Sequence, residues 1–77
     1  NLVCLFYIMN IHFTEHARYT MKKRRITEDE VISVIKYSEK TEKIDDKYYV
    51  TKNIGRGIIE VVFTRENYIK VITLYWI

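Results

Sequence analysis

His16 is the residue with the clearest capacity for chemistry in this sequence. Thr14 is a suitable N-cap for a helix that begins at Glu15, and this spacing puts His16 in the first helical turn. A histidine there can take a proton from a ribose 2′-hydroxyl or protonate a leaving 5′-oxygen, and the helix N-terminus offers N–H groups to a phosphate. The alternative is a structural histidine that bonds a strand carbonyl and fixes the strand-to-helix corner.

Cationic side chains follow His16 closely. Guanidinium groups bind phosphate bidentately, so Arg24 is our candidate for stabilising the charge that grows on a phosphorane, with Arg18 and Arg56 as further candidates. A local basic patch also suits an anionic partner such as RNA or an acidic protein. The candidate nucleic-acid-binding residues are Arg18, Lys22, Lys23, Arg25 and Arg56. The alternative is an ordinary solvated helix face.

Two residues of the last predicted strand complete the candidate catalytic set. Thr73 and Tyr75 share one strand face because they lie two positions apart, and Tyr75 can hydrogen-bond a phosphate oxygen or stack on a base. Glu60, in the middle of another predicted strand, can act as a base or pair with a cation. The alternatives are structural: Tyr75 in the core and Glu60 on an exposed sheet face.

The sequence predicts neither a metal site nor another cofactor. His12 and His16 are four residues apart, but the Thr14 cap assigns them to different elements instead of one helix face. The segment Gly55–Gly57 lies in a predicted β-turn and not before a helix, so it is no phosphate-binding loop.

A short strand and two helices must position these side chains. Apolar and polar residues alternate over Met9–Phe13, which predicts a strand with one buried face. A first helix is predicted from about Glu15 to Lys23. The segment Thr27–Glu30 is a capping box, and an apolar stripe at helical spacing follows it in a second helix that ends near Tyr37.

The second half of the chain is predicted to be β. Strand formers occupy Lys47–Lys52, Ile58–Thr64 and Tyr68–Ile77, whereas the polar segment Ser38–Asp46 is predicted to be a surface connection. A period of two divides the last strand into two apolar faces: Ile69, Val71 and Tyr75 on one, and Ile72, Leu74 and Trp76 on the other. The fold class is therefore α+β, a short strand, two helices and then an antiparallel sheet of three or four strands, in the order β-α-α-β-β-β.

Length and composition limit the organisation of the chain. Its 77 residues, 48% of them hydrophobic, suit one small domain with a thin core. We expect residues 9–77 to form this domain and residues 1–8 to be an N-terminal extension or a lead-in to the first strand, because Met9 can be the biological start. The apolar run Leu2–Met9 is much shorter than the roughly 20 residues of a membrane span. With Cys4 as the single cysteine, we expect a cytoplasmic protein without disulfides.

Two motifs resemble the family called domain of unknown function 4258. In that family a Phe-Thr/Ser-x-His-Ala segment leads into an Arg-Met-x-x-Arg-Gly-Ile segment and an acidic helix start, as Phe13–Ala17 and Met21–Val31 do here. The ending Val71–Tyr75 is similar to the family's last strand. This chain departs from the pattern at Thr20, where the family has arginine, and at Arg25, where it has glycine.

The resemblance implies a function. Family members are similar in element order to the RelE, barnase and colicin-type ribonuclease toxins. By this resemblance the chain is expected to have a RelE/barnase-like fold and to be a small, metal-independent endoribonuclease toxin, with His16 as acid or base, neutralised by a protein antitoxin. One alternative is a non-catalytic domain that binds RNA or a partner protein through the basic helix end. Another is self-association as a homodimer through the sheet.

Overall fold

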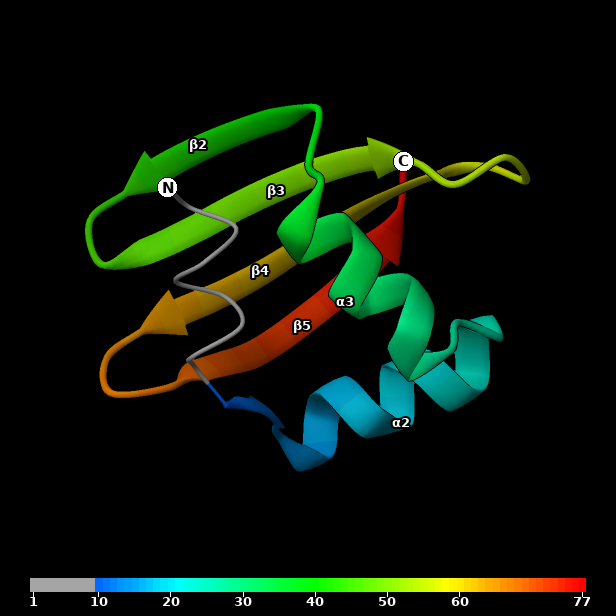
Figure 1. The fold of residues 1–77 in the computed structure, drawn as a ribbon. Coiled ribbons are helices and arrows are strands. Elements are labelled where there is room, and N and C mark those ends of the chain that lie inside the picture. Colours follow the sequence, from blue (N-terminus) through cyan, green and yellow to red (C-terminus); the bar gives the residue numbers. More distant parts are fainter. Residues whose placement is uncertain (1–9) are drawn as a thin grey trace.

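Residues 10–77 form a short strand, two helices and four further strands in a computed structural model of the chain (Figure 1). In chain order the elements are β1 (Ile11–Phe13), α2 (Glu15–Arg24), α3 (Glu28–Lys36), β2 (Lys40–Ile44), β3 (Lys47–Asn53), β4 (Ile58–Arg65) and β5 (Ile69–Trp76). The predicted α+β class is confirmed, with one strand more than the predicted order. The expected extension over residues 1–8 and a strand start at Met9 lie outside the described residues.

All five strands form one sheet in the order β1-β5-β4-β3-β2. The pairs from β2 to β5 are antiparallel, while β1 runs parallel to β5 along its first three residues, Ile69–Val71. Both helices lie on the same face of the sheet, with α2 nearer β5 and α3 over β4 and β3 (Figure 1). The sheet therefore has one face that the helices cover and one face opposite to them. A candidate residue of the sheet can face either way.

Thr14 fixes the start of α2 against the sheet. Its hydroxyl accepts a hydrogen bond from the Ala17 backbone N–H (3.1 Å), which confirms the predicted N-cap. The same hydroxyl donates to the Ile72 carbonyl (3.1 Å), and the Thr14 N–H donates to the Val71 carbonyl (3.1 Å). One residue thus caps the helix and joins it to β5.

The predicted capping box at the start of α3 is confirmed. The Thr27 hydroxyl accepts from the Glu30 N–H (3.2 Å), and the Glu30 carboxylate accepts from the Thr27 N–H (3.0 Å). The apolar stripe that follows is buried against the sheet. The main core cluster consists of Ala17, Met21, Ile26, Val31, Val34, Ile35, Val50, Ile59, Val61, Phe63, Ile69, Val71 and Leu74.

The segment Ser38–Asp46 is not the surface connection that the sequence predicts. Its residues Lys40–Ile44 form the edge strand β2, which pairs with β3. All five side chains of β2 are exposed, so the strand has no buried face and no apolar alternation. Its backbone pairing with β3 places it in the sheet, and that pairing leaves no hydrophobic pattern in the sequence.

A β-bulge in β5 corrects the predicted division of its faces. Where the register between β4 and β5 shifts, Ile72 has no partner and forms an extra residue. The bulge reverses the alternation, so Leu74 lies in the core with Val71, and Tyr75 lies on the opposite face. The predicted grouping of Tyr75 with Val71 is therefore wrong, whereas Thr73 and Tyr75 do share a face.

Arg25 ends α2 in a left-handed conformation, with φ 57° and ψ 48°. Its N–H donates to the Lys22 carbonyl (3.4 Å), and the Ile26 N–H donates to the Met21 carbonyl (2.8 Å). Glycine is favoured at such a position because a side chain there crowds the backbone. Arg25 thus brings a cation to this position together with a local backbone strain.

Replacing Arg25 with glycine is expected to stabilise the fold. Relief of the left-handed strain adds about 1 kcal/mol to the free energy of unfolding, measured by urea denaturation. The matched control is Lys23→Gly, inside α2, which is expected to lose about 1 kcal/mol because glycine weakens a helix interior. A loss of stability in Arg25→Gly contradicts the strain argument.

Candidate functional site

The exposed side of α2 carries the residues with the clearest chemistry. His16 is exposed in the first turn, as the Thr14 cap predicts. Its ring makes no hydrogen bond or ion pair within residues 10–77, so the alternative of a histidine bonded to a strand carbonyl gains no support. Thr20 and Arg24 follow His16 at helical spacings of four, and Thr20, between them, is one of the buried residues of α2. Thr20 is buried at 7% exposure and donates to the His16 carbonyl (2.8 Å).

Four consecutive cations end α2, and we call them the basic end: Lys22, Lys23, Arg24 and Arg25. All four are exposed. In the part of the chain that the structure describes, none of their side chains has a carboxylate partner. Cations in the last turn interact favourably with the negative end of the helix dipole. The basic end therefore combines a stable helix terminus with positive charge that solvent and ligands can reach.

The two other predicted cations, by contrast, are ion-paired with the first turn of α3. Arg18 Nη1 lies 3.0 Å from Glu28 Oε2. Arg56 binds Glu30 with two contacts, Nη2 to Oε1 at 2.7 Å and Nε to Oε2 at 3.0 Å. These pairs neutralise two of the acidic groups nearest the basic end, so they do not compete for its cations.

Arg56 also holds the end of α2 in place. Its Nη2 donates to the Arg25 carbonyl (2.6 Å), and its guanidinium lies 4.9 Å from the centroid of the Trp76 ring. Trp76 Nε1 in turn donates to the Arg24 carbonyl (3.2 Å). Gly57 allows this arrangement, because a Cβ there would lie 2.7 Å from the Trp76 ring. Arg56, which the sequence predicts to bind phosphate, thus contacts Glu30, the Arg25 carbonyl and Trp76, and these contacts position the basic end.

Tyr19 is a surface residue that the sequence reasoning missed. Its side chain is 62% exposed, and Lys23 Nζ lies 5.9 Å from the centroid of its ring. Tyr19 stands three residues after His16 and four before Lys23, so the three lie on one side of α2. That helical spacing was the signal in the sequence that could have found it.

Thr73 and Tyr75 lie on the sheet face opposite the helices, so they do not join His16 and Arg24 in one cluster. The Tyr75 hydroxyl donates to the Glu60 carboxylate, which also accepts from the Thr51 hydroxyl (3.4 Å). The hydrogen bond to Glu60 and, next, burial raise the pKa of Tyr75 to about 12. Tyr75 therefore holds its proton firmly and is bonded to a carboxylate, which suits a structural role better than proton transfer.

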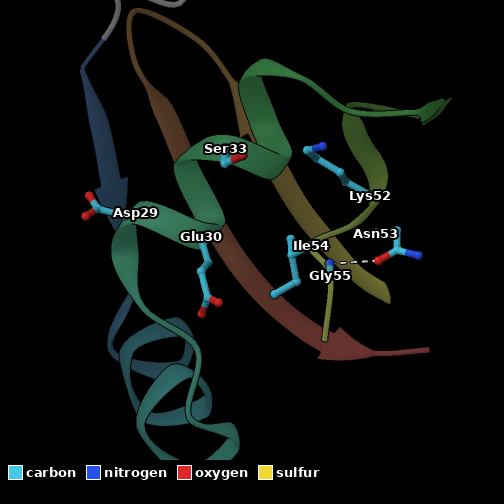
Figure 2. A pocket seen from close by; sticks show the side chains of 7 residues that line it. All are labelled: Asp29, Glu30, Ser33, Lys52, Asn53, Ile54 and Gly55. Atoms are coloured by element: carbon cyan, nitrogen blue, oxygen red, sulfur yellow. Dashed lines mark hydrogen bonds between the residues drawn. The ribbon is translucent and has the colours of Figure 1, made fainter. Parts of the chain in front are cut away.

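A groove lies between the start of α3 and the end of β3 (Figure 2). Its lining residues are Asp29, Glu30, Ser33, Lys52, Asn53, Ile54 and Gly55. The Gly55 N–H donates to Asn53 Oδ1 (2.8 Å), and the Glu30 carboxylate binds Arg56 and the Thr27 N–H. Because two of its polar groups already have partners in the chain, we assign the groove no reaction.

Metal binding and membrane insertion are two further properties that the described residues bear on. Within residues 10–77 no group of three or more histidine, cysteine, aspartate or glutamate side chains is arranged to hold a metal ion. No helix in this part of the chain is long and apolar enough to cross a membrane.

Comparison with known proteins identifies a family. The model of a family described as "Domain of unknown function (DUF4258)" matches residues 13–76. The match begins within β1 and ends at the last residue of β5, so it includes α2, α3 and the basic end. No curated protein and no solved structure matches the chain.

The Arg56–Glu30 pair predicts an acid-sensitive contribution to stability. The Arg56 hydrogen bond, with help from the Thr27 N–H, holds the pKa of Glu30 below its ordinary value of 4.5. The contribution is fully present above that value and is lost as the pH falls through the folded-state pKa. In urea denaturation over this acidic range, we expect the free energy of unfolding to fall less in Glu30→Gln than in the wild type.

The neighbouring Asp29→Asn variant is the control for this measurement. Asp29 makes no ion pair within the described residues, so the variant is expected to keep the wild-type acid dependence. An acid dependence unchanged by Glu30→Gln would show that the pair adds nothing to stability.

Proposed function

We propose that this chain, which belongs to the DUF4258 family of domains of unknown function, binds RNA through the exposed side of α2. The observation that carries the proposal is the basic end: its cations are consecutive, exposed and without carboxylate partners in the described part of the chain. Clustered lysine and arginine side chains attract phosphates and release their counterions. Two of the three acidic residues in the first turn of α3, Glu28 and Glu30, are ion-paired with Arg18 and Arg56 and so offset the charge of the basic end less.

Cleavage of the bound RNA is a second candidate function, favoured by His16. The ring is exposed, makes no hydrogen bond in the described part of the chain, and lies on the same side of α2 as Arg24. In such a reaction His16 acts as general acid or base, and Arg24 stabilises charge on the phosphorane. This proposal rests on His16 and Arg24, since Thr73 and Tyr75 lie on the far face of the sheet.

The family resemblance adds a partner to the second candidate. A ribonuclease that acts on cellular RNA needs to be held inactive, and a protein antitoxin that covers the exposed side of α2 meets this need. An acidic surface on that partner complements the basic end and displaces RNA from it.

Charge reversal tests RNA binding directly. In the variant Lys22→Glu/Lys23→Glu/Arg25→Glu, affinity for RNA is expected to fall at every sequence tested, because phosphate contacts carry no sequence information. Each lost phosphate contact is expected to flatten the plot of log affinity against log salt by about 0.7. Fluorescence anisotropy at several salt concentrations measures both quantities.

A second triple variant controls for net charge alone. Lys40→Glu/Lys43→Glu/Lys47→Glu makes the same charge change on the β2–β3 hairpin, where all three side chains are exposed. It is expected to keep most of the wild-type affinity. Equal weakening by both triple variants, or an affinity independent of salt, removes the basic end from the binding site.

The His16→Ala variant tests cleavage. Loss of a positioned acid or base is expected to slow single-turnover cleavage by about 10²–10⁴-fold, with RNA affinity and melting temperature nearly unchanged. His12→Ala is the matched control, because His12 is also exposed but lies on β1 in contact with Tyr68. If the wild-type protein binds RNA without cutting it, the cleavage candidate fails and the binding proposal stands.

A further inference from the structure

Tyr19 places an aromatic ring in the middle of the proposed RNA-binding surface. The side chain is 62% exposed, while the buried residues of α2 are Ala17, Thr20 and Met21. The ring is thus left outside the core and carries little of the packing that holds α2 to the sheet. An exposed tyrosine ring offers a ligand a flat apolar face, and the neighbours of Tyr19 on the helix indicate which kind of ligand suits it.

The neighbours of Tyr19 are cationic. Lys23 Nζ lies 5.9 Å from the ring centroid, and Lys22 is exposed three residues further along the helix from Tyr19. With a rise of about 1.5 Å per residue, the Cα atoms of Lys22 and Lys23 lie about 4–6 Å beyond the Tyr19 Cα along the helix axis. A flat apolar surface next to positive charge matches a nucleotide, whose base is flat and whose phosphate is anionic.

We infer that Tyr19 stacks on an unpaired base, so that α2 selects single-stranded RNA over double-stranded RNA; this inference rests on the proposed RNA binding. In an RNA duplex the bases are paired and stacked on one another in the interior of the double helix, and its deep, narrow major groove keeps a ring on a protein helix away from their faces. An unpaired base can turn outward and lie on the ring, while Lys23 contacts a phosphate of the same strand. Every base has a flat face, so the selection is for strand state and not for sequence.

His16 is aligned with this arrangement. It precedes Tyr19 by three residues on the same side of α2, and His16 and Lys23 are about 10 Å apart along the axis. A strand whose base lies on Tyr19 therefore passes along His16 at one end and the basic end at the other. If the bound RNA is cleaved, the stacked base sets which ribose lies beside the imidazole.

The experiment compares one RNA in two states with the full chain. A labelled mixed-sequence oligonucleotide of about 12 nucleotides is titrated alone and as a duplex with its complementary strand, by fluorescence anisotropy. Tyr19→Leu is expected to weaken binding of the single strand by about 5- to 100-fold and to leave duplex binding nearly unchanged. Tyr19→Phe keeps the ring and is expected to bind both forms like the wild type.

Tyr37→Leu is the matched control, because Tyr37 is 54% exposed at the end of the other helix. It is expected to bind both RNAs like the wild type. The inference is overturned if Tyr19→Leu leaves single-strand binding unchanged, or if it weakens both forms equally. In either case, a loss of affinity in the Lys22, Lys23 and Arg25 charge-reversal variant still supports RNA binding, so the two failures are distinguishable. If the wild-type protein binds an acidic polypeptide but binds neither the single-stranded nor the double-stranded RNA, both the stacking inference and the proposed RNA binding are overturned.

Discussion

The guanidinium of Arg56 is the contact on which the arrangement of this small domain most depends. It binds the Glu30 carboxylate at the start of α3, the Arg25 carbonyl at the end of α2 and the face of Trp76 at the end of β5. One side chain therefore joins the neighbouring ends of α2 and α3 to the end of β5. The corner between the helices is held from outside the core, and the backbone of the basic end is fixed relative to the sheet.

This corner also separates charges of opposite sign. The acidic first turn of α3 stabilises its own helix N-terminus, and the basic last turn of α2 stabilises the C-terminus of that helix. The two turns are close in the chain, yet within the described residues no cation of the basic end is ion-paired with the first turn of α3. Arg18 and Arg56 bind Glu28 and Glu30 instead. Basic residues stabilise the end of α2, and within the described residues they have no carboxylate partners. This exposed group of cations is the basis of the proposed RNA-binding surface.

Local signals in the sequence predicted the helices well. Thr14 and the capping box at Thr27–Glu30 each act within a few residues, so they can be found without knowledge of the fold. β2 could not be found in this way, because its backbone pairs with β3 while its side chains are exposed. The bulge at Ile72 was equally hidden, since one extra residue reverses the faces of β5 without any change of composition.

The candidate site shows the same limit. The spacing of Thr73 and Tyr75 predicted that they share a face, but it does not tell which face the helices cover. Arg56 was predicted to bind phosphate because guanidinium groups bind phosphate bidentately, and its ion pair with Glu30, 26 residues away, cannot be found from local spacing. Tyr19, in contrast, can be found from helical spacing, because it lies three residues after His16 and four before Lys23.

The central claim is that RNA contacts α2 and not the sheet face opposite the helices. Backbone amide chemical shifts of isotope-labelled protein, recorded during titration with single-stranded RNA, test it residue by residue. The account predicts the largest changes between His16 and Arg25, with small changes at Thr51, Glu60 and Tyr75. The largest changes at those three residues, with α2 unaffected, would contradict it and move the binding site to the opposite face.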